Sequence, residues 1–175
     1  MRVFWFGMHK LLIQTELSRL RHLGFEVFCP KYVQRSSRHQ SAANGWRADQ
    51  PSTLPEKIFK KLSDYNFFYN PISGEMAEVL NKYFDAVIVT IDPAWLMEML
   101  RVYAGKLVFR TYGHVVNMSN HLFANNGMRA ITGRDNFWYV PHALECALHE
   151  HSWLREHMIV VPYCVAQNIL SIRNT

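Results

Sequence analysis

The chain has 175 residues, 49% of them hydrophobic, which favours one folded domain and argues against a disordered chain. A formal net charge of +5 favours an acidic partner, such as a phosphate-bearing ligand, an anionic lipid surface or a nucleic acid, without choosing among them. Cys29, Cys146 and Cys164 form no CxxC pair and follow no secretory leader, so free thiols in a reducing cytoplasm are expected. The opening apolar run is too short to cross a membrane, so any membrane contact should be peripheral.

The first thirty residues predict a strand, a helix and a second strand. Residues 3–6 are a short apolar run followed by Gly7, and the next stretch carries leucines at helical spacing up to Gly24. Residues 25–29 form another apolar run, closed by a proline. A right-handed crossover between two parallel strands is therefore expected.

The middle of the chain predicts a loop and two helices. Residues 34–53 are polar and show neither the helical nor the strand periodicity of apolar residues, which indicates a long polar surface loop. Thr53 and Glu56, with Pro55 between them, have the spacing of a capping box, which predicts a helix to about residue 62. A second helix is expected over residues 74–83.

The remaining sequence repeats the alternation of strands and helices. Residues 86–91 form an apolar strand, Asp92 and Pro93 begin a helix, and residues 107–111 form the next strand. A short helix near residues 116–125 is followed by the strand "NFWYVP", the helix "HALECALHEHSWLREH" and the strand "MIVVPYCV". The pattern predicts a Rossmann-like, doubly wound α/β fold, with a mostly parallel sheet and helices on both faces.

Polar residues and glycines gather where the predicted strands end, and ligands of open parallel sheets bind at that edge. Arg110 could fork two hydrogen bonds to a phosphate or a carboxylate, Gly113 would let a ligand approach the backbone, and His114 could remove a proton. Ordinary loop and capping roles are the alternative, and for Asp92 before Pro93 a helix cap is the stronger interpretation. The candidate site residues are Gly7, Met8, His9, Asp92, Arg110, Tyr112, Gly113, His114 and His142.

Several other site classes are disfavoured. The first strand-to-helix turn has neither the dinucleotide fingerprint nor a P-loop. His149 and His151 are two residues apart in a predicted helix and point to different faces, so no metal site is expected, and Glu145 with His149 predicts a surface pair. No hydrolase nucleophile has a local signature. Nucleic acid is an unlikely partner, because the aromatic residues are not interleaved with the basic ones.

Five stretches, taken together, resemble a known family. They are "VFWFGM", "LRHLGFEVFCP", "FDAVIVTIDP", "KLVFRTYGH" and "NFWYVPHALECALHEHSWLREHMIVVPYCV". The pattern is similar to the N-terminal half of a GT-B glycosyltransferase, of the retaining kind that builds bacterial glycans. The resemblance implies two Rossmann-like domains, with the acceptor on the N-terminal one and the nucleotide-sugar donor on a C-terminal one that this chain lacks.

The resemblance also implies roles for particular residues. Gly7 would lie beneath the donor diphosphate, and His114 would be the catalytic histidine after the corresponding strand. No metal and no cofactor besides the donor nucleotide-sugar is implied, and the basic loop would meet an anionic membrane that carries a lipid-linked acceptor at the cytoplasmic face. The chain departs from the family in its single glycine at the first turn and in "PYC" where "PNG" is usual.

Because the glutamate motif of the second domain is absent, this chain is expected to be inactive alone. A non-enzymatic α/β binding or interaction domain, or half of a nucleotide-sugar epimerase, are the alternatives.

Overall fold

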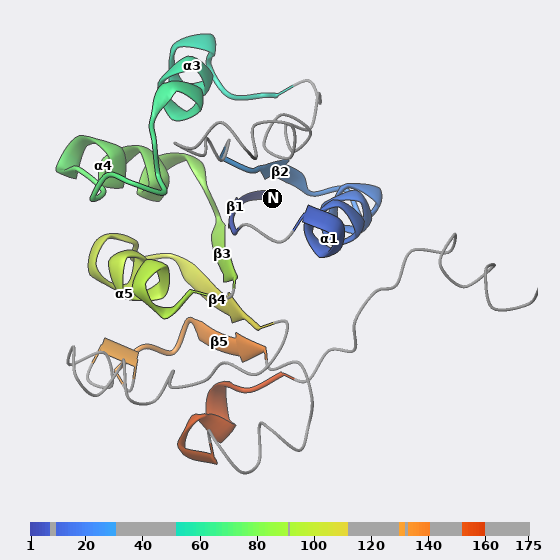
Figure 1. The fold of residues 1–175 in the computed structure, drawn as a ribbon, viewed down its shortest axis with the longest axis vertical. Coiled ribbons are helices and arrows are strands. Elements are labelled where there is room, and N and C mark those ends of the chain that lie inside the picture. Colours follow the sequence, from blue (N-terminus) through green and yellow to red (C-terminus); the bar gives the residue numbers. More distant parts are fainter. Residues whose placement is uncertain are drawn as a thin grey trace, which may run out of the picture.

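A computed structural model describes residues 1–7, 10–30, 52–90, 92–111, 130–131, 133–140 and 152–159, without the side chains of 10–14 and 152–154. Within these residues the chain forms a five-stranded, fully parallel sheet in the order β2-β1-β3-β4-β5 (Figure 1). The elements are β1 (Arg2–Phe6), α1 (Lys10–His22), β2 (Glu26–Phe28), α3 (Glu56–Asp64), α4 (Gly74–Tyr83), β3 (Ala86–Thr90), α5 (Pro93–Val102), β4 (Lys106–Arg110), β5 (Phe137–Val140) and the 3₁₀ helix η2 (Ser152–His157).

The sheet confirms the predicted Rossmann-like α/β fold. From β1 the chain passes through α1 to β2 on one side, and it later returns to β3 on the other side of β1. Figure 1 shows α1 on one face of the sheet, with α4 and α5 on the opposite face. The sheet is thus doubly wound, and the winding direction reverses between β1 and β3.

Each face of the sheet has its own apolar core, because alternate residues of a strand point to opposite faces. Phe4 and Phe6 of β1 pack in a large cluster with residues of α3, α4 and α5. Val3 and Trp5, on the other face of β1, pack with Leu17 of α1. These four side chains are almost fully buried, as expected for a strand with neighbours on both sides and helices on both faces.

The helix starts test two capping predictions. Asp92 is the N-cap of α5, its carboxylate accepts a 2.8 Å hydrogen bond from the Ala94 N–H, and Pro93 occupies the first turn, as predicted. The capping box predicted at Thr53 and Glu56 is wrong. The N-cap of α3 is Pro55, with no side-chain cap, because the Thr53 hydroxyl and N–H bond Glu26 instead.

The described end of the chain corrects one prediction and extends the sheet. Residues 152–157 form a 3₁₀ helix rather than the end of an α-helix. Met158 then forms a parallel bridge with Tyr139 of β5, and the Ile159 N–H donates to the Tyr139 carbonyl at 2.9 Å, where the last strand was predicted to begin. Most of the predicted 34–53 loop and the whole predicted 116–125 helix lie outside the described residues. No described helix combines the length and the apolar character needed to cross a membrane.

Candidate functional site

The candidate site lies at the carboxyl ends of β1 and β3, where the direction of winding reverses. These strands are neighbours, with Phe6 in register with Val89, and Gly7 and Asp92 follow their ends. One strand leads to α1 on one face and the other to α5 on the opposite face. In folds of this type the connections diverge at such a point, and ligands bind there. The structure therefore brings two predicted site residues, Gly7 and Asp92, to one edge of the sheet.

Position 7 requires a glycine, because a larger residue would collide with Thr90. A Cβ atom at position 7 would lie 2.9 Å from the Thr90 Cβ and 3.2 Å from its Cγ2, and closer still to its hydroxyl oxygen. Thr90 is fully buried, and its hydroxyl donates a long 3.5 Å hydrogen bond to the Phe6 carbonyl. The reason for glycine is therefore steric: the buried Thr90 side chain occupies the space in which a Cβ atom at position 7 would lie.

Asp92 combines a structural role with a remaining acceptor. One carboxylate oxygen caps α5 through the Ala94 N–H, and the negative charge lies at the helix end where it is favourable. The other oxygen accepts no hydrogen bond, and forms no ion pair, within the part of the chain that the structure describes. The helix-cap interpretation is therefore confirmed.

Three aromatic rings meet at the same edge, and sequence reasoning did not include them among the site residues. Phe6 stacks on Trp95 with ring centroids 4.8 Å apart, and Phe68 meets both rings at 5.0 and 5.1 Å. Phe6 is buried, whereas Phe68 and Trp95 are half-buried. The signal in the sequence was the position of Trp95, three residues after the Asp92 cap.

Arg110 is engaged inside the protein. It ends β4, is 5% exposed, and its Nε and one terminal nitrogen donate to the same Glu16 oxygen at 3.2 and 3.0 Å. These two hydrogen bonds go to a carboxylate of α1 in the same chain, whereas the predicted fork was toward a ligand. Because both side chains are mostly buried, this ion pair ties α1 to β4 beside the candidate site. Glu16 was missed, since nothing local marks the partner of a residue 94 positions away.

The remaining predicted site residues lie outside the part of the chain that the structure describes. The last described residue before Tyr112 is Thr111, which is buried. Its hydroxyl donates to the Val140 carbonyl at 3.3 Å and holds the end of β4 against β5. Among the described residues, no group of three or more histidine, cysteine or acidic side chains could hold a metal ion. Met8, His9, Tyr112, Gly113, His114 and His142 lie outside the described residues.

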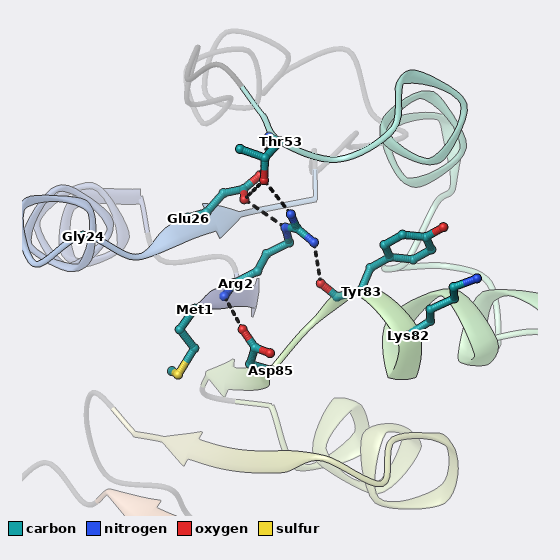
Figure 2. A pocket seen from close by; sticks show the side chains of 8 residues that line it. All are labelled: Met1, Arg2, Gly24, Glu26, Thr53, Lys82, Tyr83 and Asp85. Carbon is teal, nitrogen blue, oxygen red and sulfur yellow. Dashed lines mark hydrogen bonds and ion pairs between the residues drawn. The ribbon is translucent and has the colours of Figure 1, made fainter.

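A pocket of about 450 Å³ opens at the opposite, amino-terminal edge of the sheet. Figure 2 shows the Arg2 side chain at its centre, with Nε bonded to Glu26 at 2.9 Å and one terminal nitrogen bonded to the Tyr83 carbonyl at 3.0 Å. The other terminal nitrogen bonds Thr53 at 2.5 Å, and the Arg2 N–H bonds Asp85 at 2.6 Å. These contacts join the starts of three strands and the entry to α3. The pocket is lined by Met1, Arg2, Gly24, Glu26, Thr53, Lys82, Tyr83 and Asp85.

The amino-edge pocket has the character of a structural clamp. Burial raises the pKa of Glu26, but hydrogen bonds from Thr53, Ser52 and Arg2 outweigh it, so the pKa of that carboxyl lies below its usual value. A carboxylate with this many donors is saturated and has little capacity for a ligand. The carboxyl edge, where the winding reverses and one Asp92 oxygen has no described partner, is therefore the stronger candidate for function.

Comparison of the chain with protein-family models, curated proteins and solved structures gives no significant match. The function is therefore argued from the fold and the residues at the carboxyl edge.

Proposed function

We propose that this chain is the acceptor-side domain of a glycosyltransferase, and that its ligand binds at the carboxyl edge between β1 and β3. The observation that carries the proposal is the reversal of winding between β1 and β3, which brings Gly7 and Asp92 to one edge of a doubly wound sheet. Ligands of such folds bind outside the carboxyl ends of the strands at this point. The family resemblance adds the reaction class.

In the proposed reaction, a sugar passes from a nucleotide-sugar to an acceptor hydroxyl. The bond from the anomeric carbon to the diphosphate oxygen breaks, a bond from that carbon to the acceptor oxygen forms, and the acceptor hydroxyl passes its proton to the His114 imidazole. We assign His114 to the acceptor side of this step, and we assign the donor mainly to a second domain. Backbone amides and cations would stabilise the charge of the departing diphosphate.

The Arg110 ion pair with Glu16 has a positioning role in this proposal. Because the guanidinium already binds a buried carboxylate, replacing Arg110 would remove a charged partner from Glu16 and disturb the fold itself. His114 is therefore the better residue for a functional test, and Lys82, exposed in the amino-edge pocket, is the matched control for loss of one basic side chain.

The test is a thermal-shift screen with neutral glycans, nucleotide-sugars and free nucleotides. A ligand that binds only the native state raises its stability by RT ln(1 + [L]/Kd). We expect the melting temperature to rise with particular glycans and little with nucleotides. The glycan shift should disappear in His114→Ala and persist in Lys82→Ala. Shifts with nucleotides alone would favour an epimerase half or a nucleotide-binding module, and no shift with any glycan would refute the acceptor-domain proposal.

Contact with an anionic membrane is a separate part of the proposal, which rests on the basic 34–53 segment and on the implied lipid-linked acceptor. Co-sedimentation with vesicles should increase with their content of anionic lipid and decrease with salt. Equal pelleting with neutral and anionic vesicles would refute this part and leave glycan binding untouched.

A further inference from the structure

The first turn of α5 presents an aromatic ring and a carboxylate oxygen close together. Asp92 is the N-cap of α5, and Trp95 is the third residue of the helix. Side chains at these two positions lie near each other, and the capping box uses the same spacing. Both side chains are half-buried, so each is fixed at its base and partly open to solvent. The first turn of α5 therefore carries one apolar and one polar component at the carboxyl edge of the sheet.

Trp95 is held by two neighbouring rings. Its indole stacks on the buried Phe6 with an interplanar angle of 30°, and Phe68 meets it edge-on at 74°. This packing fixes the ring, so little side-chain entropy would be lost on binding. Trp95 thus offers a rigid aromatic surface.

The charge at this surface selects the kind of ligand. One Asp92 oxygen caps the helix, and the other can accept hydrogen bonds. Because no described cation pairs with this carboxylate, a phosphate placed beside it would be repelled. A sugar hydroxyl is instead a good donor to a carboxylate, and the C–H groups on the face of a pyranose ring can lie against an indole.

We propose that Trp95 and Asp92 form a subsite for a neutral pyranose ring of the acceptor glycan, with the ring on the indole and one hydroxyl bonded to the free Asp92 oxygen. This inference rests on the proposed function, and it specifies where the acceptor binds and that the bound ring carries no charge. Phosphate groups of the donor or of a lipid carrier would lie away from the α5 end of the site.

The experiment begins with the labelled chain on an array of neutral and anionic bacterial glycans, and affinities for the strongest neutral glycan are then measured by titration. Trp95→Leu should weaken binding about tenfold or more. Asp92→Asn keeps the N-cap, since asparagine caps as well as aspartate, but it loses the charged acceptor and should also weaken binding. Trp138→Phe, in β5, is the matched tryptophan control and should bind as the parent chain does.

A second measurement follows binding to the parent chain itself, and a variant serves only to assign one resonance. The chain has five tryptophans, so 5-fluorotryptophan labelling should give five ¹⁹F resonances, with that of Trp95 assigned from its loss in Trp95→Phe. The neutral glycan should shift the Trp95 resonance most.

The outcomes separate the two proposals. Glycan binding that is unchanged in Trp95→Leu and moves another resonance would overturn the subsite and leave the acceptor domain standing. Preference for phosphorylated or acidic glycans at Trp95 would overturn the neutral-sugar assignment. No binding to any glycan would overturn both.

Discussion

Replacing Gly7 with alanine tests the close packing of β1 against β3 at the candidate site. The added methyl group would lie 2.9 Å from the Thr90 Cβ and 3.2 Å from its Cγ2, both closer than ordinary van der Waals contact. Thr90 cannot easily move, because it is fully buried in a central strand and β-branched side chains have restricted χ1 angles. Insertion of a methyl group into such a site should distort the ends of β1 and β3.

The expected loss of stability follows from two opposing terms. Overpacking of a buried site costs about 1–3 kcal/mol, and the rigidity of Thr90 places Gly7→Ala near the upper end. Alanine also lowers the conformational entropy of the unfolded chain, which stabilises the folded state by about 0.4–1 kcal/mol. The free energy of unfolding should therefore fall by about 2 kcal/mol. Gly74→Ala is the control, because nothing lies within 4 Å of its Cβ position and the helix favours alanine, so that variant should be slightly more stable than the parent.

Urea denaturation followed by circular dichroism measures these differences, and a double-mutant cycle identifies their cause. Thr90→Gly removes all the atoms with which the new methyl group would collide, so Gly7→Ala should cost less in that background by at least about 1 kcal/mol. The reasoning is refuted if Gly7→Ala is as stable as the parent chain, or if its cost is the same with Thr90 and with glycine at position 90.

Three further predictions concern buried polar groups. Glu16→Gln should destabilise the fold by about 3 kcal/mol in urea, because the buried Arg110 loses its charged partner, whereas a cost near zero would contradict a buried ion pair. The pKa of Glu26 is lower in the folded chain than its unfolded value of 4.5, so the ionised carboxylate stabilises the fold above pH 4.5. This stabilisation is lost as the pH falls through the folded pKa. Thr53→Val removes the hydroxyl that donates one of the hydrogen bonds to Glu26, and should therefore move acid unfolding to higher pH. An unchanged acid midpoint would count against that network. Burial raises the pKa of Cys29 to about 12, so peptide mapping should find it unalkylated at about pH 8 until urea unfolds the chain. Rapid alkylation of the native protein would disprove that burial.

Local sequence patterns predicted most of the described elements. The helix over residues 74–83 and the start of α5 at Asp92 were predicted correctly, because capping residues and helical spacing act over one or two turns. Continuous apolar runs likewise identified β1 and β3 as strands covered on both faces. The predicted capping box failed because Thr53 binds Glu26, 27 positions away, which local spacing cannot anticipate.

The sequence alone determined the α/β class, the approximate elements and the strand ends at which Gly7 and Asp92 lie, because these depend on periodicity and on short-range chemistry. The tertiary structure alone decided the strand order, the contact of Gly7 with Thr90, and the cluster that Trp95 forms with Phe6 and Phe68. It also decided that Arg110 binds Glu16. Each of these depends on which distant segments become neighbours, and that is set by packing of the whole sheet rather than by any short stretch of the chain.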